Sequence, residues 1–303
     1  MSIRVRILGS NAAIPTPERA PTSQIVYIQD IPFLIDCGEG TQIRLSALKI
    51  KRSKIDHIFI SHLHGDHVYG LPGLITSFNL FGRKEKLHVY GPPGTRGLLT
   101  EILYYTNVEL HYDLEINDHS PDQSQKIFES GIVTVYTIPL NHRIPTTGYL
   151  FKEKDPPLNI IPEMIDRYSM SFNQIRQVKK GADLILPNGD TIPNDHLTRR
   201  STIPKSYAFC SDTAYSESII PVIRGVDALY HEATFMHDLV EKAEKRKHST
   251  AYQAALIAKK AEVRLLILGH FSHRYKQLDE LLQEACQVFP NTVLGEDGML
   301  ITV

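Results

Sequence analysis

Cysteine is scarce in this sequence of 303 residues, and the three cysteines that occur lie far apart. Cys37, Cys210 and Cys286 form no C-x-x-C pair, which excludes a disulfide framework and a thiolate zinc ribbon. We therefore expect three reduced and mostly buried thiols.

Net charge is almost absent as well. The 33 lysine and arginine side chains against 34 aspartate and glutamate side chains give a formal charge of −1 at pH 7. A protein that coats nucleic acid without specificity needs a broad excess of basic residues, so the balance argues against this class. A local basic patch on one face remains compatible with the balance.

Long apolar runs are missing too. No window approaches the ~18 apolar residues that a membrane span needs, and the first residues show no charged segment followed by an apolar one, as a signal peptide would. The length and the hydrophobic content of 42% suit one large α/β domain or two small ones. We expect a cytoplasmic protein.

Strand-like runs alternate with helical patterns along most of the chain. A hairpin is predicted around Gln29 and Asp30, and a helix over 251–261 is predicted to start with a capping box of Thr250 and Gln253. The predicted strands cover 4–8, 25–28, 33–36, 57–60, 87–90, 132–138, 207–211, 228–231 and 265–268, and two further helices cover 41–48 and 71–81. This order indicates two sheets flanked by helices.

The segment 152–200 interrupts this pattern. It is polar, punctuated by proline and glycine, and predicted to hold one helical piece around 161–168. Its local basic residues are Lys152, Lys154, Arg167, Arg176, Lys179, Lys180, Arg199 and Arg200. So long a segment with a weak core signal indicates an appended arm, and the alternative is a partly disordered surface insertion without a role.

Four potential metal ligands fall within six residues, at His62, His64, Asp66 and His67. Imidazole nitrogen and carboxylate oxygen are the ligands of catalytic zinc sites. His62 and His64 are two residues apart at a strand end, so both side chains leave on the same side, and Gly65 lets the backbone turn. Asp66 and His67 then lie at a helix start and can face a second metal. The alternative, an ordinary hydrogen-bonded histidine, would have to apply three times in one short segment.

Three more candidates follow predicted strands, where α/β scaffolds present site residues. His142 follows the strand over 132–138, Asp212 follows 207–211, and His270 follows 265–268. Asp212 could bridge two metals through its two carboxylate oxygens.

These motifs resemble the metallo-β-lactamase superfamily and, within it, the ribonuclease Z family of short-form tRNA 3′-processing endonucleases. The matching segments are DCGEGTQ at 36–42, SHLHGDH at 61–67, CSDT at 210–213, HEAT at 231–234, HST at 248–250 and GHFS at 269–272. The histidine cluster is typical of the whole superfamily, whereas HEAT and DCGEGT are far more specific.

The resemblance implies a four-layer αββα sandwich over 1–303, with a flexible arm inserted at 152–200 that grips tRNA. It also implies two Zn²⁺ ions per subunit, a homodimer, and precursor tRNA as the substrate. Many members carry Gly-Pro in the tip of the arm, whereas 169–173 contains neither residue.

Residue roles follow from the same resemblance. It implies metal ligation by His62, His64, Asp66, His67, His142, Asp212 and His270. Asp66 would also accept a proton from a metal-activated water, the nucleophile, and His248 would act as general acid. Glu232 would hold His248, and His231 would support the metal ligands. The cut would leave a 3′-hydroxyl on the tRNA and a 5′-phosphate on the trailer.

Alternatives remain at each level. His248 could be a solvated histidine beside Lys245, Arg246 and Lys247. The fold could serve a lactonase, a sulfatase or a small-molecule phosphodiesterase, although the arm and the His248 segment favour RNA. A non-catalytic metal-binding scaffold is disfavoured because every ligand position is filled. The neutral net charge predicts that tRNA binds to a local patch formed by 83–86 and the arm.

Overall fold

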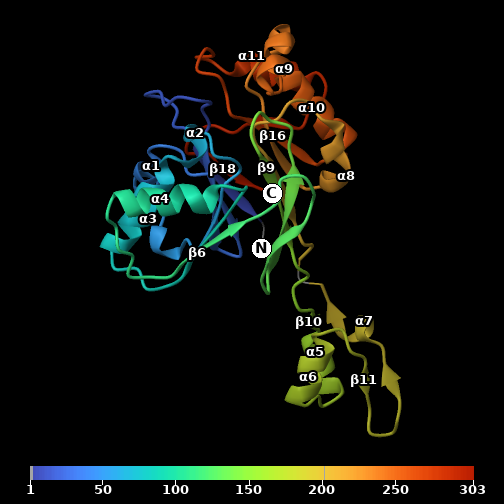
Figure 1. Cartoon of the computed structure of the whole chain (residues 1–303). Coiled ribbons are helices and arrows are strands. Elements are labelled where there is room, and N and C mark those ends of the chain that lie inside the picture. The colour runs from blue at the N-terminus through green and yellow to red at the C-terminus, as the bar shows by residue number, and fades with distance from the viewer. Residues whose placement is uncertain (1–2, 201) are drawn as a thin grey trace. The chain divides into compact units, whose positions relative to one another are not determined.

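The structure is a computed structural model that describes residues 3–200 and 202–303. The chain divides into two compact units (Figure 1). The smaller unit spans Glu153–Pro204, and the larger unit contains the described residues before and after it.

Two seven-stranded sheets form the centre of the larger unit. The first has the order β18-β1-β2-β3-β4-β5-β6, with β1 (Arg4–Gly9), β2 (Ser23–Ile28), β3 (Ile31–Ile35), β4 (His57–Phe59), β5 (Leu87–Gly91), β6 (Leu114–Asp118) and β18 (Leu300–Thr302). The second has the order β17-β16-β15-β14-β9-β8-β7, with β7 (Lys126–Glu129), β8 (Val133–Pro139), β9 (Thr147–Glu153), β14 (Ser206–Cys210), β15 (Ala228–Glu232), β16 (Leu265–Gly269) and β17 (Thr292–Leu294). In each sheet a parallel half, β3 to β6 or β14 to β17, adjoins an antiparallel half.

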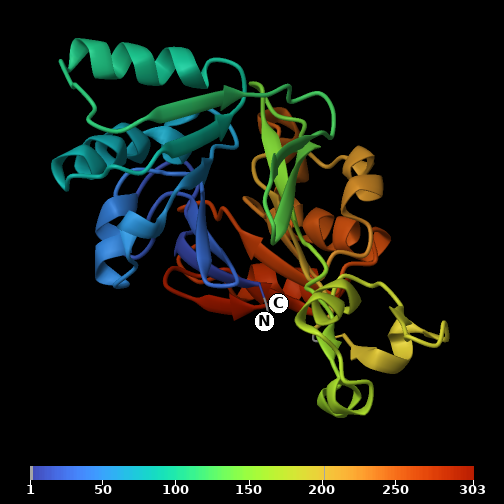
Figure 2. The same ribbon diagram turned by 90° about the horizontal axis from the view of Figure 1, so that it is seen from below.

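Helices cover the outer face of each sheet, which gives four layers (Figure 2). The first sheet packs against α1 (Thr41–Ala47), α3 (Gly70–Leu80) and α4 (Thr95–Tyr105), and the second against α8 (Ile220–Ile223), α10 (Ala251–Lys260) and α11 (Asp279–Cys286). Between the sheets lies an aromatic core that includes Phe33, Phe59, Tyr149, Phe151 and Phe209. The predicted two-sheet α/β architecture is confirmed.

Local sequence signals account for several elements. Gln29 and Asp30 both have positive φ, 49° and 66°, and they turn β2 into β3 as the predicted hairpin. Thr250 accepts a hydrogen bond from the backbone of Gln253 and caps α10, as predicted. Strands β6, β7, β9, β17 and β18 were not predicted; β7, β17 and β18 have only three or four residues, too few for a clear period of two.

The smaller unit is more structured than its sequence predicts. It contains α5 (Pro162–Arg167), α6 (Phe172–Val178), α7 (Asn194–Leu197) and two strand pairs, β10 (Asn159–Ile160) with β13 (Thr198–Arg199) and β11 (Leu184–Ile185) with β12 (Thr191–Ile192). A small core of Met170, Val178, Leu184 and Leu197 holds it together. The helical piece expected around 161–168 is confirmed as α5, but the expectation that the segment holds only one helix was wrong. The capping box of Ser171 and Gln174 at the start of α6 was a usable signal.

The predicted basic patch at 83–86 is also wrong in its first residue. Arg83 is buried, and its guanidinium donates to the carbonyls of Ile55, Glu85 and Lys86 at 2.7 to 3.0 Å. Lys86 pairs with Glu115. Buried carbonyls need donors, so Arg83 is committed to the backbone and is not available to a phosphate.

Within residues 3–200 and 202–303, no helix is both long and apolar enough to cross a bilayer.

Candidate metal centre

The predicted ligands meet where strands from both sheets end. The turn after β4 leads into α2 (Gly65–Val68) and carries His62 to His67, whereas His142, Asp212 and His270 follow β8, β14 and β16 of the second sheet. A cavity of about 520 Å³ opens over this point.

One group of donors comprises His62, His64, His142 and Asp212, whose ligand atoms all lie within 4.8 Å of one another. His64 Nδ1 lies 3.0 Å from His62 Nε2 and 3.3 Å from His142 Nε2. Asp212 Oδ2 lies 3.6 Å from His62 Nε2 and 3.7 Å from His142 Nε2.

A second group comprises Asp66, His67 and His270 within the same limit. Asp66 Oδ2 lies 3.4 Å from the Nε2 atoms of both histidines. The other oxygen of Asp212, Oδ1, lies 3.1 Å from His270 Nε2 and 3.3 Å from His67 Nε2. Asp212 thus presents one oxygen to each group.

The two groups fit metal ions. Facing ring nitrogens at 3.0 to 3.3 Å need a proton or a cation between them. Burial and, to a smaller extent, the neighbouring His67 hold the pKa of His62 well below its usual range. Its ring is therefore neutral and can donate a lone pair. Imidazole and carboxylate donors are the set that zinc takes in catalytic sites.

His67 marks the point where positive charge is favoured most. Burial lowers the pKa of its ring, but the carboxylates of Asp66, Asp212 and Asp36 outweigh burial and raise it well above the usual value. Three carboxylates around one ring, those of Asp36 and Asp212 buried and that of Asp66 partly buried, stabilise any cation placed there. This electrostatic environment suits a divalent ion.

Asp36 orients His67 and was not given a role from the sequence. Its Oδ2 lies 2.8 Å from His67 Nδ1, while Ser61 donates its backbone N–H to Oδ1 at 2.7 Å and its hydroxyl to Oδ2 at 2.9 Å. The carboxylate fixes the ring so that Nε2 faces the cluster. Asp36 has φ of 55°, an uncommon conformation for a non-glycine residue. The only sequence signal was its place at a strand end within the DCGEGT segment.

Two more rings are held in the same way. His142 Nδ1 donates to the carbonyl of Lys247 at 2.8 Å. His270 Nδ1 lies 3.0 Å from the hydroxyl of Thr234. In both rings the nitrogen that faces the other donors is therefore Nε2.

Asp66 is held in its ionised form. Burial raises the pKa of this carboxyl, but His67 and the hydrogen bonds from His270 and His67 reverse that effect, and the pKa falls well below its usual range. The backbone N–H of Ala13 also donates to Oδ2 at 2.7 Å.

His248 lies beside the donor groups and is bound to Glu232. Its Nδ1 is 2.8 Å from Glu232 Oε1, and its ring is 5.6 Å from that of His270. Burial disfavours the charged ring, yet Glu232 and Asp212 together raise the pKa of His248 to about 9. The atom of His248 that lies 3.9 Å from Asp212 is also Nδ1. Since Nδ1 is engaged by Glu232, His248 is a poor metal ligand through this atom.

Glu232 is fully buried and accepts three further hydrogen bonds. Thr213 and Thr234 donate their backbone N–H groups at 3.0 and 3.1 Å, and the Thr234 hydroxyl donates at 2.7 Å. His231 is buried as well. Its Nδ1 lies 2.8 Å from the Glu232 carbonyl, and no described residue bonds its Nε2. The support of metal ligands by His231 stays a prediction.

The cavity has features that sequence reasoning missed. Arg143, Arg246 and Arg274 line it, and so does Tyr69, whose side chain is 70% exposed. The one sequence signal was proximity, since Arg143 follows His142 and Arg246 lies two residues before His248. Cationic walls and an exposed aromatic ring favour an anionic substrate that carries planar groups.

Similar proteins share this chain's length. It is 46% identical over 299 residues to Ribonuclease Z of Parabacteroides distasonis, covering 99% of this chain and 98% of the relative. Ribonuclease Z of Porphyromonas gingivalis is 43% identical over 297 residues, with 98% of each covered. A family model described as "Anti-Pycsar protein Apyc1" matches residues 3–142.

Solved structures agree on the fold. The crystal structure of human tRNase Z, short form, superposes with a TM-score of 0.71 at 25% identity and covers 98% of both chains. The metallo-beta-lactamase fold protein YhfI from Bacillus subtilis superposes with a TM-score of 0.70 at 20% identity over 100% of both. The expected metallo-β-lactamase sandwich is confirmed.

We expect Asp36→Asn to weaken zinc retention by roughly 10- to 100-fold, because the carboxylate that orients His67 and favours positive charge is lost. Zinc content after dialysis against graded chelator measures this. Asp30→Asn is the matched control, since Asp30 is exposed in the β2–β3 turn and pairs only with Arg4 among the described residues. Equal retention in all three proteins would show that Asp36 does not support the centre.

Proposed function

Because the chain belongs to the ribonuclease Z family, we propose that it is a zinc-dependent endoribonuclease that removes the 3′ trailer from precursor tRNA. One observation carries this proposal: two donor groups share Asp212 at the floor of a cavity walled by arginines, with His248 beside them. The proposal includes a homodimer in the cytoplasm, as family membership suggests.

The donor groups suggest how two zinc ions would be held. His62, His64, His142 and Asp212 would hold one, and Asp66, His67, His270 and Asp212 the other. Bound there, the ions would acidify a water molecule and neutralise charge on the phosphate.

Proton transfer falls to the chain's own residues. Asp66, ionised and fixed by the backbone of Ala13, would orient the attacking water and take its proton. His248 would give a proton to the departing 3′-oxygen through Nε2, since Glu232 occupies Nδ1. The P–O3′ bond breaks, so the tRNA keeps a 3′-hydroxyl and the trailer keeps the phosphate on its 5′ end.

Substrate binding would use the cavity wall and the smaller unit. Arg143, Arg246 and Arg274 would contact phosphates near the cut, and Tyr69 would stack on a base. Residues 153–204 hold seven basic and seven acidic side chains, so the arm is not basic as a whole. Lys179, Lys180 and Arg200 nevertheless line one hollow, which we propose as its tRNA contact.

The proposal is tested with zinc-loaded protein, a 3′-extended precursor tRNA and bis-p-nitrophenyl phosphate. We expect one cut at the 3′ end of the tRNA body, and end-group analysis should find a 3′-hydroxyl and a 5′-phosphate on the two products. Hydrolysis of the small diester with an intact precursor would instead assign a small-molecule phosphodiesterase.

His248→Ala should lower turnover of precursor tRNA by ~100-fold or more, the usual contribution of a general acid, while zinc content stays at the wild-type level. Single-turnover cleavage and metal analysis measure both. His273→Ala removes another imidazole that lines the same cavity and serves as the control. Unchanged turnover in His248→Ala would remove it as the acid, and lost zinc would make it a ligand.

Replacing residues 161–197 with Asn-Gly should weaken cleavage of precursor tRNA by ~10-fold or more and spare the small diester, because only the large substrate needs distant phosphate contacts. Ile160 and Thr198 pair directly, so a two-residue turn can join β10 to β13. Lys179→Glu with Lys180→Glu tests the same contact in an intact arm. An equal fall in both activities would mean that the smaller unit supports the fold instead.

A further inference from the structure

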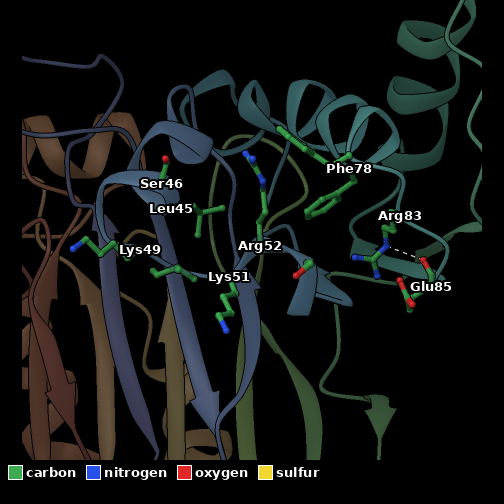
Figure 3. Close-up of a pocket in the computed structure, with 11 residues that line it drawn as sticks. Leu45, Ser46, Lys49, Lys51, Arg52, Phe78, Arg83 and Glu85 are labelled. Carbon is green, nitrogen blue, oxygen red and sulfur yellow. Dashed lines mark hydrogen bonds between the residues drawn. The ribbon is translucent and has the colours of Figure 1, made fainter.

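A second cavity, of about 450 Å³, lies between α1, the 3₁₀ helix η1 (Arg52–Lys54) and the end of α3 (Figure 3). Leu45, Ile50, Phe78 and Phe81 give it an apolar lining. We call it the α1–α3 cavity. Its volume is in the range of small-molecule sites.

The α1–α3 cavity is separate from the metal centre. Helix η1 precedes β4, and Glu85 precedes β5, so the cavity lies at the amino-terminal ends of these parallel strands. The segment that carries His62 to His67 leaves the carboxyl end of β4. No residue that lines the metal-centre cavity lines this one, among the described residues.

Three cations at this cavity have no acidic and no hydrogen-bonding partner among the described residues. Across the described chain, the side chains of Lys49, Lys51 and Arg52 make neither a hydrogen bond nor an ion pair. Figure 3 shows Arg52 extending between α1 and α3, with Lys49 and Lys51 reaching outward at the rim. Glu85 is the one carboxylate among the described lining residues. The described residues that line the cavity therefore carry a net positive charge.

An aromatic platform adjoins these cations. The Arg52 guanidinium carbon lies 3.9 Å from the centre of the Phe81 ring, and Phe81 is 68% exposed. The guanidinium thus lies over the ring of an exposed phenylalanine. Nucleobases stack on phenylalanine rings and on guanidinium planes, while Lys and Arg bind phosphate.

We propose that the α1–α3 cavity binds a nucleotide, with its phosphate at Lys49, Lys51 and Arg52 and its base against Phe81 and the apolar lining. A free mononucleotide and a nucleotide within an RNA strand share this chemistry. The cavity would therefore be a second nucleotide site, at the amino-terminal ends of β4 and β5 and thus at the end of the strands opposite to the metal centre.

The test is photocrosslinking of zinc-loaded, full-length protein with 8-azido-AMP, followed by peptide mapping. We expect label in the peptides that contain Arg52 or Phe81, and competition by unlabelled AMP. Arg52→Ala should weaken AMP binding, measured by calorimetry, by ~10-fold or more. Lys54→Ala, on the same helical turn but outside the lining, should bind within about twofold of wild type.

Further arms separate the sources and guard against misfolding. Pentaadenylate binding more tightly than AMP would indicate an RNA strand, and equal affinities would indicate a free nucleotide. Arg52→Lys keeps the charge but loses the planar guanidinium, so with unchanged melting temperature it should still bind AMP more weakly than wild type.

Label confined to the metal-centre cavity, or equal affinity in Arg52→Ala, would overturn the proposal. Dissociation of a dimer by Phe81→Glu in sedimentation would do so too, because a second copy would then cover the cavity.

Discussion

Three carboxylates, those of Asp36, Asp66 and Asp212, converge on the ring of His67, and much of the larger unit serves to keep them there. Without a positive charge among them, their mutual repulsion and their burial would oppose folding. Asp36 follows β3 and Asp66 lies in α2, which follows β4 of the first sheet, whereas Asp212 follows β14 of the second sheet. The arrangement therefore requires that the two sheets be joined at a fixed distance.

Contacts between the sheets set that distance. Phe59 of the first sheet packs edge-on against Tyr149 of the second, and the Tyr149 hydroxyl donates to the carbonyl of Ile60 at 2.5 Å. One residue further on, the backbone N–H of Thr147 donates to the carbonyl of Ser61 at 2.9 Å. These bonds lie immediately before His62, so the aromatic core positions the donor segment as well as excluding water.

The sequence predicts what is local and misses what depends on distant partners. His62 to His67 form a pattern that can be recognised within six residues, and the capping box at Thr250 needs only four. The task of Asp36 depends on a contact to His67, 31 residues away. From the sequence, Arg83 was expected at the surface because its side chain is charged. In the structure it is buried, and it donates to the backbone carbonyls of Ile55 and Lys86, which precede β4 and β5. Helix α5 of the smaller unit was predicted, but α6 and α7 were not, because the core of this unit uses only a few scattered apolar residues.

The register of β9 and β14 shows how the smaller unit is inserted into the second sheet. These strands are antiparallel neighbours, and Lys152 pairs with Ser206, so the chain departs and returns at adjacent points. For the sheet, all of the residues between them amount to the connection of one hairpin. Closing a loop becomes only slowly more costly as the loop lengthens. Evolution could thus lengthen, shorten or exchange this connection while β9 and β14, the strand that Asp212 follows, kept their pairing. Substrate preference could then change independently of the chemistry at the metal centre.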